Sequence, residues 1–385
     1  MSLSLPLPHL AEQYLLDPDV VYLNHGSFGA VPRPVFESYQ HWQRELDANP
    51  SHFVGRRAPE LLAAAREKLG GFINASANDL TFVPNVTYGL NIVARSLDLK
   101  EGDVVLTTDH EYGAIDRTWR FNCEKSGARL VNQPISVPVA DPAKVVEQIW
   151  AGVNENTRVL SLSHITSPSA LILPVEEICR RAREAGIITV VDGAHAPGQL
   201  DVDMEEIGAD FYCGNCHKWL SSARGAGFLH ARPERQSLLE PLVVSHGWDR
   251  EEPGPSQFQD YFTWVGTIDP AAYLSVPAAI DFHQQNDWGS VRLACKELLK
   301  ETEERILAMS GLPPISPSSM WSQMRLVLLP GKVESYQRLW EEDRIVVPVG
   351  QHRGQPGVRI SVQAYNSPAD LEKLILALQK AASAS

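Results

Sequence analysis

The segment Cys213–Trp219 places one lysine where its amine could act as a nucleophile. Its sequence is C-G-N-C-H-K-W, so Lys218 stands among apolar and small residues. Burial in such surroundings lowers the pKa of a lysine amine, because desolvation disfavours the charged form. A neutral lysine amine can form a Schiff base with an aldehyde. The sequence therefore indicates covalent catalysis through Lys218.

An acidic residue upstream would complete this chemistry. The apolar run Ile187–Val191 is followed by Asp192. A carboxylate at the end of a buried parallel strand lies at the sheet edge where ligands bind. Pyridoxal 5'-phosphate (PLP) is an aldehyde cofactor that also needs a carboxylate beside its ring nitrogen. Asp192 and Lys218 together predict a PLP site, and the alternative for Asp192 alone is a turn residue or helix cap.

The two cysteines of this segment permit a competing interpretation. Cys213-x-x-Cys216-His217 has the spacing of covalent haem attachment and of half a zinc site. No second C-x-x-C pair occurs among the five cysteines of the chain. We therefore expect free cysteines packed near a strand end and no metal. A non-enzymatic haem carrier is kept as an alternative.

Three further positions could hold parts of a cofactor or substrate. Thr87 follows the apolar run Leu80–Val83 and opens a predicted helix, whose free backbone N–H groups would cradle a phosphate. Tyr112 lies just beyond a predicted strand and could stack on a planar cofactor. Arg359 stands inside the apolar strand Val358–Val362, where it needs an anionic partner. A substrate carboxylate or a structural salt bridge would serve.

The elements that position these residues alternate between strands and helices from about residue 58 to 230. Apolar strands are expected at Val104–Thr107, Val159–Leu162 and Ile187–Val191. An amphipathic helix is expected between Pro174 and Gly186. This alternation predicts an α/β fold with a mostly parallel, doubly wound sheet. A surface loop or lid is expected at residues 251–256.

The C-terminal part is expected to form a smaller α/β domain. Its predicted elements are an apolar segment at 324–329, a helix at 333–342, a Gly-rich turn before the strand 358–362, and a helix at 368–382. We expect an N-terminal segment at residues 1–20, a large domain at 21–270 and a small domain at 271–385.

Composition excludes several classes of protein. The 385 residues are 44% hydrophobic and 21% charged, which is typical of soluble globular proteins. A net charge of −13 argues against nucleic acid as a partner. No apolar run reaches the roughly 18 residues of a membrane helix, so we expect no membrane partner. The first ten residues contain no Lys or Arg, so we expect no secretory signal and a cytoplasmic enzyme.

Four motifs in this order resemble one enzyme family. They are N-V-T at 85–87, D-G-A-H at 192–195, H-K at 217–218 and R-I-S at 359–361. The pattern is similar to that of class V aminotransferases, which are PLP enzymes of fold type I. N-H-G-S-F-G at 24–29 and W-V-G-T at 264–267 resemble the branch that holds isopenicillin N epimerase and C–S lyases such as hercynylcysteine sulfoxide lyase.

This resemblance implies roles for individual residues. Lys218 would hold PLP and move protons at the substrate Cα, and Asp192 would pair with the ring nitrogen. His195, where desulfurases carry Gln, would bond the phenolic oxygen, and Tyr112 would stack on the ring and act in catalysis. The phosphate would be bound by Val86, Thr87, Asn215, His217 and, from a second subunit, Thr267. The small-molecule substrate, an amino acid, would be bound by Arg359, Asn24, His25 and His164. The shared phosphate site implies a homodimer.

The sequence departs from the cysteine desulfurases at one point. Those enzymes carry a catalytic cysteine shortly before the carboxylate-binding arginine, whereas this chain has no cysteine after Cys295. A persulfide mechanism is therefore not expected. Proton removal at Cα can still lead to epimerisation, to elimination of a β-sulfur group or to transamination. The resemblance favours the first two, and a class V aminotransferase is the alternative.

Overall fold

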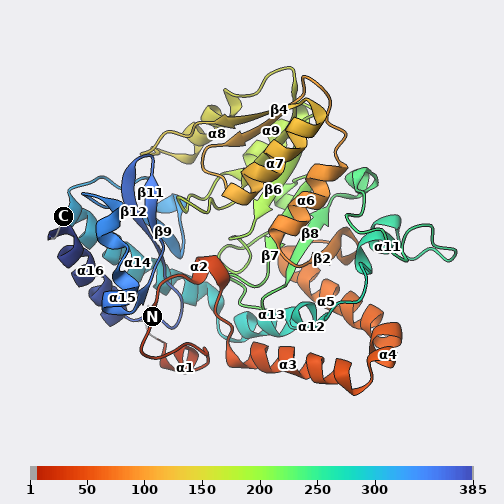
Figure 1. Cartoon of the computed structure of the whole chain (residues 1–385), viewed down its shortest axis with the longest axis horizontal. Helices are drawn as coiled ribbons and strands as arrows, with labels where there is room; N and C mark the ends of the chain where they lie inside the picture. The colour runs from red at the N-terminus through yellow and green to blue at the C-terminus, as the bar shows by residue number, and fades with distance from the viewer. Residues whose placement is uncertain (1–6, 384–385) are drawn as a thin grey trace.

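A seven-stranded sheet forms the centre of the computed structural model, which describes residues 7–383 (Figure 1). The strand order is β2-β8-β7-β6-β5-β3-β4, and β8 alone runs antiparallel to its neighbours. The strands are β2 (Leu80–Val83), β3 (Val104–Thr108), β4 (Arg129–Gln133), β5 (Thr157–Ser163), β6 (Ile188–Gly193), β7 (Phe211–Asn215) and β8 (Gly227–Ala231). The predicted α/β sheet is confirmed.

Helices cover both faces of this sheet because both faces are apolar. Val190 packs into a core cluster with residues of α6 (Val86–Ser96) and α7 (Gly113–Ser126). The next residue, Val191, packs into the cluster that includes α8 (Pro142–Trp150) and α9 (Val175–Glu184). Successive side chains of a strand point to opposite faces. The continuous apolar run of β6 therefore buries two surfaces, as the sequence predicts for a doubly wound sheet.

A smaller antiparallel sheet lies beside the large one. It has the order β11-β12-β9, with β9 at Met324–Leu328, β11 at Val349–His352 and β12 at Gln355–Ser361. Figure 1 shows these strands together with α14 (Trp288–Ser310), α15 (Leu339–Asp343) and α16 (Pro368–Ser383) on one side of the molecule. The observed strand β12 is longer than the predicted strand 358–362 and begins three residues earlier.

The N-terminal chain lies against this C-terminal unit. β1 (Val21–Tyr22) pairs in parallel with β10 (Ile345–Val346). The predicted domain boundaries stay a prediction, and the residues 1–6 and 384–385 that they include lie outside the described residues. The remaining helices are α1 (Pro8–Ala11), α2 (His25–Phe28), α3 (Arg33–Ala48), α4 (Pro50–His52), α5 (Ala58–Ile73), α10 (Met204–Ile207), α11 (Gln257–Thr263), α12 (Ala271–Leu274) and α13 (Val276–Gln285).

Two predicted elements of the C-terminal unit differ in the structure. The helix expected at 333–342 is a 3₁₀ turn at Val333–Tyr336 followed by α15. Its buried residues Val333, Tyr336 and Leu339 recur every three positions, which suits a 3₁₀ turn better than an α-helix. The expected Gly-rich turn is mostly paired in the β11–β12 hairpin. Residues 251–256 form an exposed loop before α11, as predicted. Within residues 7–383, no helix is both long and apolar enough to cross a membrane.

Candidate active site

Lys218 lies in the loop after β7, where its amine meets a histidine. The Nζ atom is 3.3 Å from Nε2 of His195. Desolvation lowers the pKa of the Lys218 amine to about 8, and the nearby charge of Asp192 only partly opposes this. At pH 7, one unit below this pKa, about one tenth of the amine is neutral, which is several hundred times the fraction of an ordinary lysine. This is the state that the predicted nucleophile requires.

Asp192 stands at the carboxyl end of the central strand β6. Its side chain is 4% exposed, and its Oδ1 accepts a hydrogen bond of 2.8 Å from the backbone N–H of Ala194. Burial raises the pKa of this carboxyl, while the Ala194 N–H and the charge of Lys218 lower it. A buried carboxylate with a free second oxygen suits a cationic ring nitrogen. The structure thus brings Asp192, Lys218 and His195 together.

The N-terminal N-H-G-S-F-G motif at residues 24–29 packs against the loop that carries Lys218. Gly29 has φ +69°, and a Cβ there would lie 2.1 Å from the carbonyl oxygen of His217, so only glycine fits. His25 is fully buried, and its Nε2 lies 3.0 Å from the carbonyl oxygen of Lys218. Its Nδ1 is 3.1 Å from the hydroxyl of Tyr365. Both ring nitrogens of His25 therefore have protein partners, and neither is free for a substrate.

Three of the expected phosphate-binding residues, Val86, Thr87 and Asn215, lie at the start of α6. The side-chain oxygen of Asn215 accepts a 3.0 Å hydrogen bond from the N–H of Val86. Asn85 caps the helix by accepting from the N–H of Tyr88 at 2.9 Å. Thr87 lies between these two bonded positions and lines a surface pocket along α6. Helix N–H groups and the partial positive charge of the helix start favour an anion here.

His217 faces the same loop through its ring. Its Nδ1–H donates a 2.7 Å hydrogen bond to the carbonyl oxygen of Ala226, just before β8. Burial lowers the pKa of His217 to about 4, so the ring is neutral at neutral pH. A turn that includes Gly225 leads into β8.

Arg359 on β12 is a cation without an acidic partner. Its Nη1 donates to the carbonyl oxygen of Ser167 at 2.6 Å, and its Nη2 donates to the hydroxyl of Ser27 at 2.8 Å. Its Nε is buried with no partner, and none of residues 7–383 forms an ion pair with it. Desolvation lowers the pKa of Arg359 to about 10. The guanidinium thus keeps an unfilled position for an anion.

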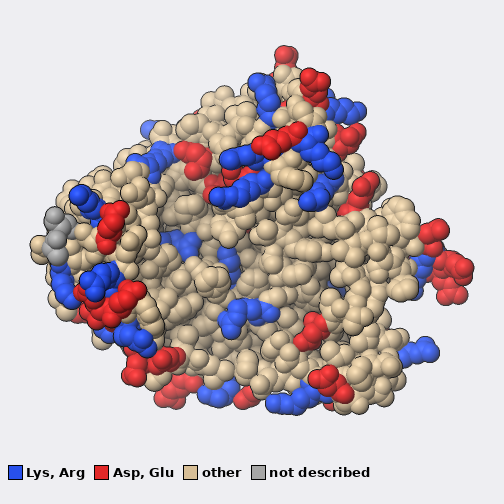
Figure 2. Space-filling view, in the orientation of Figure 1, with Lys and Arg blue, Asp and Glu red and all other residues tan. Residues whose placement is uncertain are grey.

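Electrostatics place Arg359 in the same site as the lysine. The charge of Arg359 contributes to the lowered pKa of both Lys218 and His195. Tyr112, half-exposed at the start of α7, is near enough to raise the pKa of Arg359 slightly. Figure 2 shows Lys and Arg side chains in a hollow between the C-terminal unit and the large sheet.

Three other predicted residues lie elsewhere or are already bonded. Asn24 accepts a 2.5 Å hydrogen bond from the hydroxyl of Ser27, so it contacts the site through that serine. His164 is buried, with Nδ1 3.0 Å from the hydroxyl of Tyr212. Thr267 is exposed after α11 and forms no hydrogen bond within the described chain. The roles assigned to these residues stay predictions.

Sequence reasoning missed Glu111, although it follows a strand end like Asp192 does. Its carboxylate oxygens accept 2.6 Å hydrogen bonds from the hydroxyls of Thr108 and Ser163. Burial raises the pKa of Glu111 to about 7, and the negative charge of Asp192 adds to the shift. Ser163 is the register partner of Asp192 between β5 and β6. The argument used for Asp192, that a carboxylate at the end of a buried parallel strand lies at the ligand-binding edge of the sheet, also applies to Glu111.

The two cysteines of the C-x-x-C pair do not converge. Cys213 packs in the core cluster on the α6 and α7 side, whereas Cys216 packs in the other cluster. Both thiols are fully buried and free. Among residues 7–383, no three His, Cys, Asp or Glu side chains are grouped so that they could hold a metal. This placement leaves the haem and zinc interpretations without a ligand pair.

The donor groups of the site match the needs of PLP. A lysine amine with a lowered pKa is available for its aldehyde, a buried carboxylate for its ring nitrogen and an N-terminal helix end for its phosphate. The Nε of Arg359 is buried without a hydrogen-bond partner among the described residues. The residues present therefore fit the cofactor that the sequence predicts.

Comparisons with known proteins agree with this geometry. The family model described as aminotransferase class-V matches residues 21–374. The isopenicillin N epimerase of Amycolatopsis lactamdurans is 36% identical over 387 residues, covering 96% of this chain and 97% of that protein. The enzyme of the same name from Streptomyces clavuligerus is 37% identical, covering 94% and 95%. A putative L-cysteine desulfhydrase of Oryza sativa subsp. japonica is 30% identical, covering 94% and 83%.

Solved structures share the fold. A cysteine desulfurase of Thermococcus onnurineus NA1 superposes with a TM-score of 0.85 over 100% of both chains at 21% identity. A cystine C–S lyase, solved with its product cysteine persulfide, gives a TM-score of 0.82 at 22% identity, covering 94% of this chain and 98% of that chain. The predicted fold of type I PLP enzymes is confirmed. With the family model spanning most of the sequence, the chain belongs to the class V aminotransferases and is a PLP-dependent enzyme.

Proposed function

We propose that the enzyme removes the Cα proton of an amino acid and returns a proton to the opposite face, as an epimerase. The observation that carries this proposal is that one N-terminal motif contacts both Lys218 and Arg359. His25 Nε2 lies 3.0 Å from the carbonyl oxygen of Lys218, and the Ser27 hydroxyl accepts a 2.8 Å hydrogen bond from Arg359. The arginine charge also lowers the pKa of the lysine amine. An amine that moves protons and a cation that fits a carboxylate thus share one site. The relatives named isopenicillin N epimerase match nearly the whole chain.

Each residue would contribute one physical effect. When bound, PLP withdraws electrons from the Cα–H bond of the attached substrate. Arg359 would hold the carboxylate and so fix which Cα bond faces Lys218. The neutral amine of Lys218 would take the Cα proton. Asp192 would stabilise positive charge at the ring nitrogen, and His195 would donate Nε2–H to the phenolic oxygen.

Epimerisation needs a second acid on the other face of the substrate. His25 does not suit this role as it is placed, because both of its ring nitrogens have partners. The hydroxyl of Tyr112 is half-exposed and electrostatically coupled to Arg359. We therefore assign the second proton transfer to Tyr112. Tyr112→Phe should keep Cα exchange by Lys218 but lose inversion.

A C–S lyase is the second candidate, because elimination needs only one base. Lys218 would take the Cα proton while the β-carbon–sulfur bond breaks, and the sulfur leaves with its electron pair as a thiolate. For cysteine, addition of water then gives pyruvate, ammonia and hydrogen sulfide. The absence of any cysteine after Cys295 is compatible with this route. The desulfhydrase relative has the matching activity in its name.

Proton NMR in D₂O distinguishes these reactions. The PLP-loaded enzyme would be given isopenicillin N, free amino acids and cysteine conjugates without a keto acid. Cα exchange with inversion supports the epimerase, and pyruvate formation replaces it with the lyase. Turnover that requires a keto acid would establish the aminotransferase instead. Lys218→Ala is the control and should show none of these signals.

We further propose a homodimer in which Thr267 of each chain completes the phosphate site of the other. Thr267 is exposed, and exposed apolar side chains such as Val244 and Trp248 lie in the preceding segment. Mixing Lys218→Ala and Thr267→Ala subunits tests this arrangement, because a mixed dimer would contain one site free of both changes. Recovered activity supports shared sites, whereas a purely additive mixture contradicts them. The cytoplasmic location stays a prediction from the sequence.

A further inference from the structure

Arg353 occupies the tip of the β11–β12 hairpin in an unusual backbone conformation. His352 and Gln355 are paired, so Arg353 and Gly354 form a two-residue turn. Their φ angles are +51° and +81°. Turns of this kind favour Asn-Gly, because a residue with a larger side chain is disfavoured in the left-handed region. An arginine at this position suggests that its side chain has a use.

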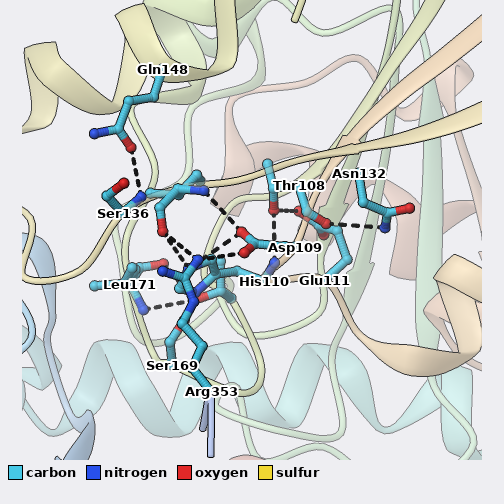
Figure 3. A network of polar contacts seen from close by, with 12 residues as sticks. Thr108, Asp109, His110, Glu111, Asn132, Ser136, Gln148, Ser169, Leu171 and Arg353 are labelled. Carbon is cyan, nitrogen blue, oxygen red and sulfur yellow. Dashed lines mark hydrogen bonds and ion pairs between the residues drawn. The ribbon is translucent and has the colours of Figure 1, made fainter.

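The side chain reaches the large sheet and is bound there. Figure 3 shows the Arg353 guanidinium among Asp109 and His110, which follow β3. Its Nη2 forms an ion pair with Oδ2 of Asp109 and donates a 2.6 Å hydrogen bond to the carbonyl oxygen of Ile135, beyond β4. Oδ1 of Asp109 accepts from the N–H of Ile135 at 2.9 Å. Asp109 is therefore held by the backbone of Ile135 as well as by Arg353.

The His110 ring also lies against the Arg353 guanidinium. Its Nδ1 lies 2.7 Å from the hydroxyl of Ser169, and its Nε2 lies 3.1 Å from the carbonyl oxygen of Ile135. Nε2 is also 3.3 Å from Nη2 of Arg353. Burial lowers the pKa of His110, so the ring stays neutral beside the guanidinium. A fixed, neutral ring leaves Asp109 as the charge partner of Arg353.

The hairpin and the loop after β3 each also carry a residue of the candidate active site. Arg359 lies six residues after Arg353 on β12, and Tyr112 lies three residues after Asp109. The two active-site residues are electrostatically coupled. β12 is paired with β11 from Gln355 to Val358 and with β9 from Gly357 to Ser361, so continuous strand pairing connects the hairpin tip to Arg359. The position of the hairpin tip therefore bears on the position of Arg359.

The ion pair between Arg353 and Asp109 is partly exposed to solvent, which limits its contribution to stability. The side chains of Arg353 and Asp109 are 38% and 30% exposed. Exposed ion pairs add little to the stability of a fold, because water screens them and side-chain entropy opposes them. A small energy is still enough to shift the balance between a docked and an undocked hairpin. The contact is thus better suited to positioning than to stabilising the protein.

We propose that Arg353 is a positioning residue that docks the β11–β12 hairpin on Asp109 and thereby holds Arg359 in place for the substrate carboxylate. This rests on the proposed role of Arg359 as the carboxylate-binding residue. Loss of this contact should change the affinity for the substrate, because neither Arg353 nor Asp109 contacts the reacting atoms.

Steady-state kinetics of Arg353→Gln, Asp109→Asn and the double variant test the proposal. We expect KM for the amino-acid substrate to rise about two- to fivefold with kcat little changed, on the scale of one screened ion pair. The double variant should resemble each single variant, because both remove the same contact. Arg353→Lys should recover part of the loss. Arg305→Gln is the matched control, since it breaks an exposed 2.6 Å ion pair to Glu372 elsewhere in the C-terminal unit.

Two further measurements separate this proposal from the role of Arg359. Hydrogen exchange of the β12 amides should be faster in Arg353→Gln and Asp109→Asn than in Arg305→Gln. Binding of an amine that lacks the carboxylate should not change. If both variants match the control in KM and exchange while Arg359→Lys loses carboxylate affinity, the docking proposal is wrong and the proposed function stands. If Arg359→Lys keeps that affinity, both are overturned.

Discussion

Trp219 donates its indole N–H to Nδ1 of His195 over 3.3 Å. An indole nitrogen can only donate, so Nδ1 must be the unprotonated nitrogen of the ring. Burial holds the pKa of His195 well below its usual range, and the ring is therefore neutral with its proton on Nε2. That proton faces Nζ of Lys218 at 3.3 Å. The contact thus favours a neutral lysine amine, which can accept the hydrogen bond.

Trp219→Phe should raise the pKa of Lys218 from its value of about 8. Without the indole N–H, the His195 proton can move to Nδ1, and Nε2 can then accept from a lysine ammonium. The rate at which apoenzyme captures PLP, followed against pH, reports the neutral amine and should shift its midpoint upward. Trp321→Phe is the control, because Trp321 is equally buried and its Nε1 has no partner. An unchanged midpoint in Trp219→Phe would remove Trp219 from this role.

Asp192→Asn should bind PLP in part but lose most of its reactivity. The neutral amide cannot stabilise a positive ring nitrogen, so Cα–H exchange in D₂O should slow by about 100-fold or more, on the scale of losing one active-site electrostatic contact. Asp203→Asn, which alters a surface helix cap, should keep its exchange rate. Normal exchange in Asp192→Asn would show that the carboxylate serves only the local turn.

Arg359→Lys should weaken binding of the substrate carboxylate. A lysine ammonium is a point charge and cannot reproduce the planar fork that also bonds Ser27 and Ser167. The loss of a charged hydrogen bond corresponds to roughly a 10- to 100-fold rise in KM. A competitive carboxylate inhibitor measures the same effect as Ki. Equal Ki values for Arg359→Lys and the parent enzyme would return Arg359 to a structural role.

Glu111 should make the stability of the apoprotein depend on pH. Burial raises its pKa from 4.5 to about 7, so the folded state holds its proton more tightly than the unfolded state. Stability from this group is full below pH 4.5 and is lost as the pH rises to about 7. Glu111→Gln should flatten that part of the curve in urea unfolding experiments at several pH values. A curve that keeps its slope in Glu111→Gln would assign the loss to another group.

Much of the large sheet could be predicted because its signals are local. The apolar runs of β3, β5 and β6 are buried on both faces, and Gly186 ends the preceding helix region with φ +70°. The pairing of β1 with β10 could not be predicted, because each strand has only two residues and their partners lie far apart in sequence. The pairing of β11 with β12 could not be predicted either, because the turn between them has Arg353 where a glycine or asparagine is expected.

The candidate site could be predicted where one residue carries the chemistry. Lys218 and Asp192 follow strand ends, and their distance in sequence matches neighbouring parallel strands. The partners that tune them come from remote segments. Ser167 and Ser27 bond Arg359 across 192 and 332 residues, which no local pattern reveals. His25 belongs to a conspicuous motif, yet only the folded chain shows that it bonds the Lys218 carbonyl.

Borohydride reduction of the PLP-loaded enzyme tests the central claim most directly, because it fixes the cofactor on the amine that binds it. Peptide mass spectrometry should then find the pyridoxyl group on Lys218 alone, and Lys218→Ala should bind no cofactor that borohydride can fix. A label on another lysine, or a Lys218→Ala protein that keeps the visible absorbance and the label of the parent enzyme, would contradict the assignment of Lys218.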